Sequence, residues 1–237
     1  MSTPKLLLRI LLFRHGRTKY LGNGSFPDLT PEGIAQADEM TQTRIIPWLS
    51  KHEVRLENLL FLTSPAPRAH GTAWMVAREI GYLHPHRLQF PDGLAPMFWR
   101  DPVKAQEMLL PFRGRSYVDY ETELAFQDAD VFETPGEVRA RWYAFFADLI
   151  RQRIRSPNSR FQNVFISSHY EVLCNVTHDL FGIVASAHTA LQHTEPIMLT
   201  ISEGSYRDEV YITGEFRGRH TDVAIFNLRT EKLIYCA

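Results

Sequence analysis

The stretch Leu6–Thr18, LLLRILLFRHGRT, determines how the rest of the chain is interpreted. Its first eight residues are apolar except for Arg9, so the run is too short for a membrane span, which takes about 20 apolar residues. Such a run is typical of a strand buried on both faces of a sheet. In open α/β sheets, ligands bind beyond the carboxyl ends of the strands. Arg14, His15 and Arg17 therefore leave the strand where such a protein keeps its chemistry.

Two arginines beside a histidine are suited to binding an anion, most naturally a phosphate. The guanidinium groups of Arg14 and Arg17 offer planar forks of donors that stay charged. His15 is a candidate nucleophile or general base, and Gly16 allows the backbone to approach a ligand closely. The alternative interpretation is a solvated basic turn after a core strand. The tripeptide Arg14-His15-Gly16 alone does not decide between this turn and an anion site.

The bulk properties indicate one globular domain that acts on a small molecule. A length of 237 residues suits a single α/β domain over residues 1–237, and 44% hydrophobic with 22% charged residues is ordinary for such a protein. The net charge of −1 gives no reason to expect nucleic acid or a membrane surface as partner. No signal peptide is predicted and the two cysteines make no disulfide scaffold, so we expect a cytoplasmic protein.

The arrangement of the first strand recurs twice along the chain. Residues 58–63 (NLLFLT) form a second apolar strand candidate, and Arg68 follows it in the first turn of a helix. The helix dipole disfavours a cation there, so Arg68 is not placed for helix stability. Residues 163–168 (NVFISS) form a third strand candidate, followed at once by His169. We therefore expect a second arginine and a second histidine at strand ends.

The remaining segments complete an α/β pattern. Thr30 and Pro31 open a first helix, and Thr134 with Glu137 forms a capping box that opens another. Residues 83–133 are irregular and are predicted to be a lid or insertion. Residues 196–237 alternate apolar and polar and predict strands or a hairpin at the sheet edge. We expect a three-layer α/β fold: a mostly parallel sheet flanked by helices, with a lid insertion.

Four motifs in this order carry a resemblance. They are Arg14-His15-Gly16-x-Thr18, Asp28-Leu-Thr-Pro-Glu-Gly33-x-x-Gln36-Ala37, Ser64-Pro-x-x-Arg68-Ala-x-x-Thr72-Ala73, and Ser168-His169. Together, over roughly residues 6–182, they resemble the histidine phosphatase superfamily, the phosphoglycerate mutase-like proteins.

The resemblance implies hydrolysis of a phosphomonoester through a phosphohistidine on His15, without a metal or other cofactor. It implies that Arg14, Arg68 and His169 clamp the phosphoryl oxygens, where fixed positive charge stabilises phosphoryl transfer. Arg17 and Asn23, which lies in a glycine-rich loop, are candidates for further phosphate contacts.

The resemblance leaves the general acid open between two carboxyl groups. The phosphoglycerate mutase branch uses a glutamate in a Leu-x-Glu motif, and the nearest match here, residues 94–96, has proline in the place of the acid. Another branch places its acid just after the second histidine, as Glu171 is placed here. Glu171 is the first candidate and Asp92 the second. The alternatives are a carboxylate favoured by a helix N-terminus for Glu171, and a turn residue for Asp92.

Other functions and partners follow from the same residues. The alternatives are mutase-type phosphoryl transfer and a non-catalytic phosphate-binding or regulatory protein. The expected partner is a small phosphorylated molecule, and neither its identity nor the oligomeric state follows from the sequence. The remaining histidines considered lack companions at ligand spacing and are expected to be lid or surface residues rather than a metal site: His84, His86, His188 and His193.

Overall fold

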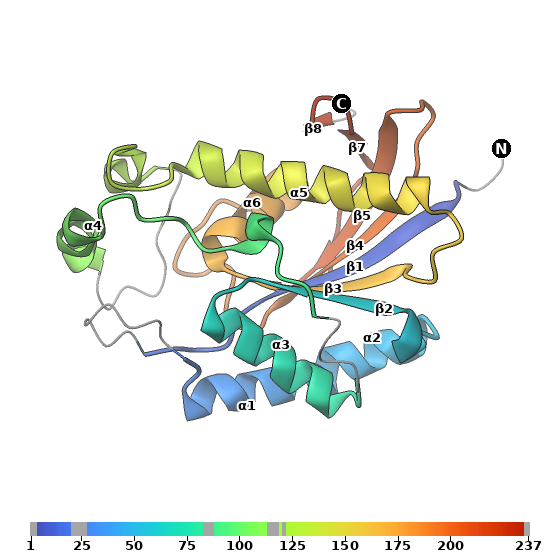
Figure 1. The fold of residues 1–237 in the computed structure, drawn as a ribbon, viewed down its shortest axis with the longest axis horizontal. Coiled ribbons are helices and arrows are strands. Elements are labelled where there is room, and N and C mark those ends of the chain that lie inside the picture. Colours follow the sequence, from blue (N-terminus) through green and yellow to red (C-terminus); the bar gives the residue numbers. More distant parts are fainter. Residues whose placement is uncertain (1–3, 20–27, 83–87, 113–118, 120–121, 235–237) are drawn as a thin grey trace.

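The protein is built around a central mixed sheet. The computed structural model describes residues 4–19, 28–82, 88–112, 119 and 122–234. The described residues form an eight-stranded sheet in the order β2-β3-β1-β4-β5-β7-β8, with β6 paired to β5 (Figure 1). The strands are β1 (Leu6–Arg14), β2 (Leu59–Thr63), β3 (Asn163–Ser168), β4 (Pro196–Glu203), β5 (Glu209–Phe216), β6 (Arg219–His220), β7 (Ala224–Asn227) and β8 (Lys232–Ile234).

The direction of the strands changes at β1. β2, β3 and β1 run parallel, whereas β4 pairs antiparallel with the other side of β1 and the strands after it continue antiparallel. The carboxyl ends of β1, β2 and β3 therefore meet at one edge of the sheet. The amino end of β4 reaches the same edge, because Pro196 lies opposite Phe13. The expectation that all the last strands lie at the sheet edge is wrong for β4, which is an interior strand between β1 and β5.

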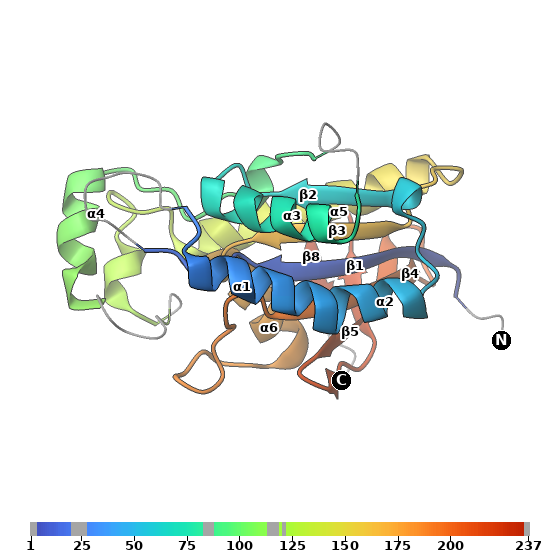
Figure 2. The same cartoon turned by 90° about the horizontal axis from the view of Figure 1, so that it is seen from below.

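Helices cover both faces of the sheet, which confirms the expected three-layer α/β fold. The sheet is mixed rather than mostly parallel, because among the described strand pairs only β2-β3 and β1-β3 are parallel. Helices α1 (Pro31–Met40), α2 (Ile46–Lys51) and α3 (Pro67–Glu79) lie on one face, and α5 (Pro135–Arg155) and α6 (Tyr170–Phe181) lie on the other (Figures 1 and 2). On β1, Leu11 and Phe13 belong to the core on the first face, and Ile10 and Leu12 to the core on the second. Burial on both faces explains why β1 is almost continuously apolar.

The helix ends follow the sequence signals. The Thr30 hydroxyl accepts a hydrogen bond from the Gly33 N–H at 3.1 Å, with Pro31 at the first helical position of α1. The predicted capping box of α5 is confirmed, since the side chains of Thr134 and Glu137 bond each other's backbone N–H groups. α6 ends at Gly182, whose φ of 62° lies in the left-handed region that favours glycine.

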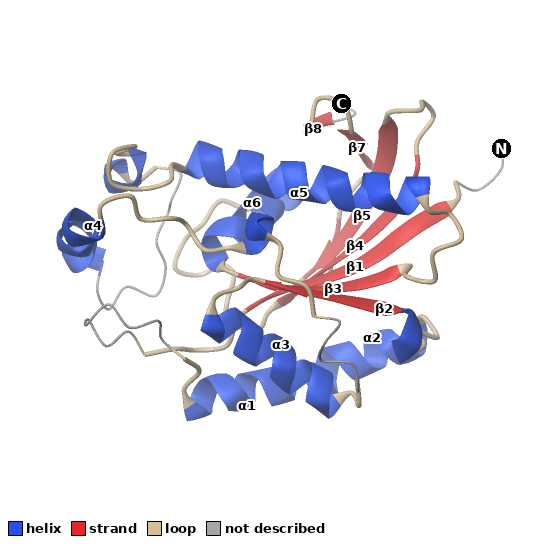
Figure 3. Cartoon of the chain, viewed as in Figure 1, coloured by secondary structure: helices blue, strands red, loops and turns tan. Residues whose placement is uncertain are grey.

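The described part of residues 83–133 consists mainly of loop and short helical turns (Figure 3). Its longest element, α4 (Pro102–Leu109), lies beyond the carboxyl end of β1 in both ribbon views. Phe126 and Phe132 are fully buried and belong to the same core cluster as Val138 and Trp142 of α5. Where it is described, this segment therefore adds to the core as well as extending past the strand ends. No helix in the described ranges combines the length and apolar character that a bilayer crossing demands.

Candidate active site

Four of the residues predicted for the site meet at the edge where β1, β2 and β3 end. Arg14 is the last residue of β1 and His15 follows it; Arg68 lies in the first turn of α3, and His169 precedes α6. His15 is 4% exposed, Arg68 7% and His169 0%. The rings of His15 and His169 lie 5.1 Å apart between centroids, and the Arg68 Nε–H donates to His15 Nε2 at 3.2 Å.

The hydrogen bonds of His15 determine which of its nitrogens can react. Its Nδ1 lies 2.7 Å from the carbonyl oxygen of Gly16. A carbonyl only accepts hydrogen bonds, so Nδ1 carries the hydrogen and Nε2 holds the electron pair that accepts the Arg68 Nε–H. Burial, and then the charges of Arg68 and Arg14, hold the pKa of His15 well below its ordinary value. His15 is therefore neutral at pH 7, which is the state that a nucleophilic imidazole requires.

Gly16 is needed for a close contact between two backbones. A Cβ on Gly16 would lie 2.4 Å from the carbonyl oxygen of Gly33, and a Cβ on Gly33 would lie 2.2 Å from that of Arg17. The Gly16 N–H donates to the Thr72 hydroxyl at 2.9 Å, which in turn donates to the Arg68 carbonyl at 2.8 Å. The sequence interpretation assigned to Gly16 an approach to a ligand. In the structure, Gly16 instead approaches the backbone of α1. This contact and the Thr72 hydrogen bonds join residues 14–18, the arginine-histidine loop, to α1 and α3.

His169 presents an unpartnered ring nitrogen inside the site. Its Nε2 lies 2.8 Å from the Ser64 hydroxyl, while its Nδ1 is buried and has no hydrogen-bond partner among the described residues. Burial, and then the charge of Arg68, keeps the pKa of His169 well below its ordinary value. Buried polar atoms nearly always have a partner, so Nδ1 is suited to contact an oxygen of a bound ligand.

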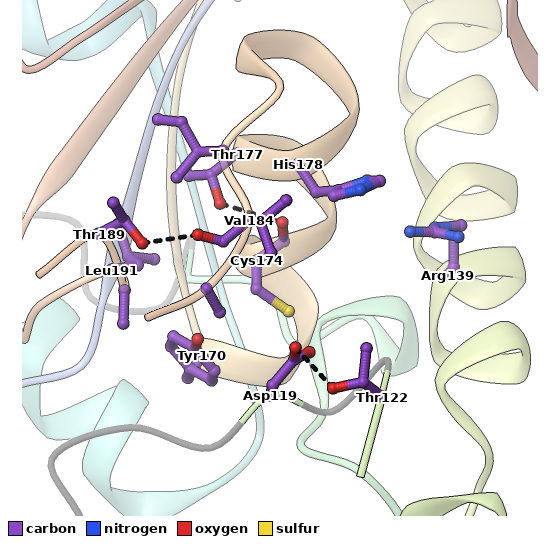
Figure 4. Close-up of a pocket in the computed structure, with 13 residues that line it drawn as sticks. Asp119, Thr122, Arg139, Tyr170, Cys174, Thr177, His178, Val184, Thr189 and Leu191 are labelled. Carbon is purple, nitrogen blue, oxygen red and sulfur yellow. Dashed lines mark hydrogen bonds between the residues drawn. The ribbon is translucent and has the colours of Figure 1, made fainter. Parts of the chain in front are cut away.

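The guanidinium of Arg14 contacts Leu191 and Tyr170. Its Nη1 donates to the Leu191 carbonyl at 2.9 Å, and its guanidinium lies 5.2 Å from the centroid of the Tyr170 ring. Tyr170 and Leu191 also line a cavity of about 240 Å³ beside α6, together with Cys174 (Figure 4). Arg14, His15, Arg68 and His169 are not among the residues that line this cavity.

The two acid candidates occupy different environments. Glu171 lies in the first turn of α6, and its carboxylate accepts the Met97 N–H at 3.1 Å. Met97 directly follows Pro96, which stands where the Leu-x-Glu motif would have its acid. The carboxylate of Glu171 therefore reaches the neighbourhood of that position from another element. Asp92 is exposed at the start of a short helical turn, and its backbone carbonyl accepts a hydrogen bond from Arg141 at 2.7 Å.

The further phosphate contacts are only partly visible. Arg17 forms an ion pair with Glu32 at 2.7 Å on the surface, and its charge helps to lower the pKa of His193. Arg17 thus lies at the rim of the cluster rather than inside it. Asn23, and also His84 and His86, lie outside the described residues.

His193 lies beside the cluster, which the sequence analysis did not predict. Its ring centroid lies 5.7 Å from that of His15. His193 is half-buried rather than exposed, whereas His188 on the same loop is exposed as expected. The error came from placing β4 at the sheet edge, away from β1. Within the described ranges, no three His, Cys, Asp or Glu side chains gather as a metal would require.

The fold is similar to that of several solved proteins. One is phosphoglycerate mutase from Bacillus anthracis str. Sterne, with 16% sequence identity and a TM-score of 0.58. The match covers 91% of this chain and 94% of the mutase chain. Another is mycobacterial glucosyl-3-phosphoglycerate phosphatase, with 18% sequence identity and a TM-score of 0.56. The match covers 88% of this chain and 97% of the phosphatase chain. At these identities the likeness concerns the fold alone.

The family is shown by the sequence itself. No curated protein sequence matches the chain. The sequence profile of the histidine phosphatase superfamily (branch 1), however, matches residues 10–210, which include the whole cluster at the strand ends. The chain belongs to the histidine phosphatase superfamily.

Proposed function

We propose that the protein is a phosphomonoesterase that works through a phosphohistidine on His15. The observation that carries this proposal is the hydrogen bond from His15 Nδ1 to the Gly16 carbonyl, since it leaves the electron pair on Nε2. The Arg68 Nε–H, which that pair accepts in this structure, turns to a phosphoryl oxygen when the substrate binds. Nε2 attacks phosphorus, the N–P bond forms and the ester P–O bond breaks. Water then hydrolyses the N–P bond and releases phosphate. Arg14, Arg68 and His169 hold the nonbridging oxygens through both steps.

The proposed general acid is Glu171. An alkoxide leaving group needs a proton as the P–O bond breaks, and a carboxylic acid is a common donor. Glu171 is two residues beyond His169 and its carboxylate contacts the backbone next to Pro96. After giving its proton to the leaving oxygen, the same carboxylate accepts a proton from the attacking water.

The proposal is tested by release of phosphate from an aryl phosphate, comparing the wild type with His15→Ala in the presence and absence of a chelator. We expect turnover that survives the chelator and is lost in His15→Ala, while His188→Ala keeps the wild-type rate. Turnover that persists in His15→Ala would overturn the proposal. An absence of turnover with aryl phosphates, sugar phosphates, nucleotides and phosphopeptides, with phosphate binding retained, would favour the binding-protein alternative. Recovery of the phosphoryl group on a second alcohol rather than on water would identify a mutase.

A further inference from the structure

The topology of the sheet explains why His193 lies beside His15. His15 directly follows β1, and His193 lies three residues before β4. Because β1 and β4 are antiparallel neighbours, with Phe13 opposite Pro196, the end of one strand and the start of the other share an edge. The loop before β4 therefore brings a fourth segment of the chain to the site, beside those that carry His15, Arg68 and His169.

The backbone around His193 is firmly held. The Thr194 N–H donates to the Arg14 carbonyl at 3.1 Å, which ties the loop to the residue before His15. The Glu195 carboxylate accepts the Gln192 N–H at 2.9 Å and pairs with Arg217 Nη2 at 2.7 Å. These contacts on both sides of His193 limit the positions that its ring can adopt.

Thr194 adds a strained conformation at the same place. Its φ is +56°, and it is the only buried non-glycine residue with positive φ in the part of the chain that the structure describes. A β-branched residue in this region costs free energy, about 1 to 3 kcal/mol, and such residues cluster at ligand sites. Thr194 is 7% exposed and its conformation sets the direction in which the chain leaves His193.

The charges near His193 are those that would attract an anion. Burial, followed by the charges of Arg14 and Arg17, lowers the pKa of His193 to about 3. The ring is therefore neutral at pH 7 and has one N–H donor and one free electron pair. A neutral donor beside two cations suits an oxygen of a phosphoryl group better than it suits a metal ion or a cation.

We propose that His193 is a third histidine of the phosphate site and donates a hydrogen bond to a nonbridging oxygen of the phosphoryl group bound at His15. The proposal deepens the proposed function and rests on it for the identity of the anion. His193 then contributes to holding the oxygens together with His169, from a loop that the family motifs of this chain do not include. In this role His193 donates a hydrogen bond and transfers no proton, so its proton stays on the ring throughout.

The experiment measures binding of orthovanadate and of inorganic phosphate by calorimetry to the wild type, His193→Ala and His188→Ala. Loss of one hydrogen bond to a charged ligand predicts a dissociation constant about 10- to 100-fold higher in His193→Ala. His188→Ala, which changes an exposed histidine of the same loop, is expected to bind as the wild type does. Binding by His193→Ala within twofold of the wild type would overturn the proposal.

A second pair of variants covers the case in which His193→Ala unfolds. His193→Gln keeps an N–H donor and His193→Leu, of similar size, does not. Weaker binding in the leucine variant than in the glutamine variant supports the proposal, and equal binding overturns it.

The proposed function and this inference fail in distinguishable ways. Vanadate binding that depends on His193 without any turnover removes the phosphatase and leaves the inference standing. Turnover with vanadate binding that does not depend on His193 removes the inference alone. A wild type that binds neither vanadate nor phosphate and shows no turnover overturns both.

Discussion

At the scale of single residues, Ser64 determines how His169 presents its ring. The Ser64 hydroxyl lies 2.8 Å from His169 Nε2, so it influences which ring nitrogen carries the hydrogen. We predict that Ser64→Ala lowers kcat by roughly tenfold or more and lowers the free energy of unfolding by about 1 to 3 kcal/mol, because a buried ring nitrogen loses its partner. Ser64→Thr keeps the hydroxyl and is expected to retain more activity. Equal kcat values for the alanine variant and the wild type would show that Ser64 has no positioning role.

Glu171 is tested by the nature of the leaving group. An alkyl alkoxide needs a proton, whereas an aryl oxide leaves readily without one. Glu171→Gln is therefore expected to lower kcat on alkyl phosphates by about 10²- to 10⁴-fold, with a much smaller effect on aryl phosphates. Asp92→Asn, which changes an exposed carboxyl group, is the matched control and is expected to affect both substrates little. The opposite pattern, with Asp92→Asn impaired on alkyl esters, would transfer the role of the acid to Asp92.

At the scale of elements, α1 lies directly on the arginine-histidine loop through Gly16 and Gly33. Alanine normally stabilises a helix relative to glycine, by about 1 kcal/mol. Gly33→Ala is nevertheless expected to lower the free energy of unfolding by about 1 to 3 kcal/mol, because its Cβ would lie 2.2 Å from the Arg17 carbonyl. Activity should fall as well, since the loop carrying His15 must shift. Chemical denaturation and phosphatase assays of the purified variant check both effects.

The control is another glycine inside a helix. Gly136 lies in the first turn of α5, and a Cβ there would have no neighbour within 4 Å. Gly136→Ala is expected to raise the free energy of unfolding by about 0.4 to 1 kcal/mol and to leave activity unchanged. If both alanine variants were stabilised, the close contact between α1 and the loop would not matter for stability.

The secondary structure elements also explain which site and core residues could be predicted from the sequence. Arg14, Arg68 and His169 were predictable because each follows an apolar run, and parallel strands bring their carboxyl ends together. His193 was not, because alternation in residues 196–203 indicates a strand but does not indicate which neighbour it pairs with. Phe126 and Phe132 were likewise hidden: an irregular segment has no period to show which of its aromatic residues enter the core. Glu171 stays a prediction, since its contact with Met97 places the carboxylate but does not test its role.

At the scale of the whole molecule, the buried histidines make folding sensitive to acid. His15 and His169 are held neutral in the folded protein, whereas unfolded histidine has a pKa of about 6.5. Below pH 6.5 the unfolded chain binds more protons than the folded one, so stability falls as the pH falls toward the lowered folded values. Replacing His169 by Asn should make this decline shallower, by up to about 1.4 kcal/mol per pH unit. Denaturation curves from pH 7 to 5 measure the slope, and identical slopes would contradict the neutral state of His169.

The antiparallel placement of β4 beside β1 also has a consequence for how the protein acquires its activity. Arg14 lies opposite Ser168, and Phe13 opposite Pro196, so the first strand must wait for partners from the far end of the sequence. Such distant pairings slow folding, because a long loop must close before its contacts form. During synthesis, His15 emerges early, but it can meet His169 only after β3 has been made, and His193 only when the chain reaches β4. The complete histidine cluster is therefore among the last features that a nascent or refolding molecule gains.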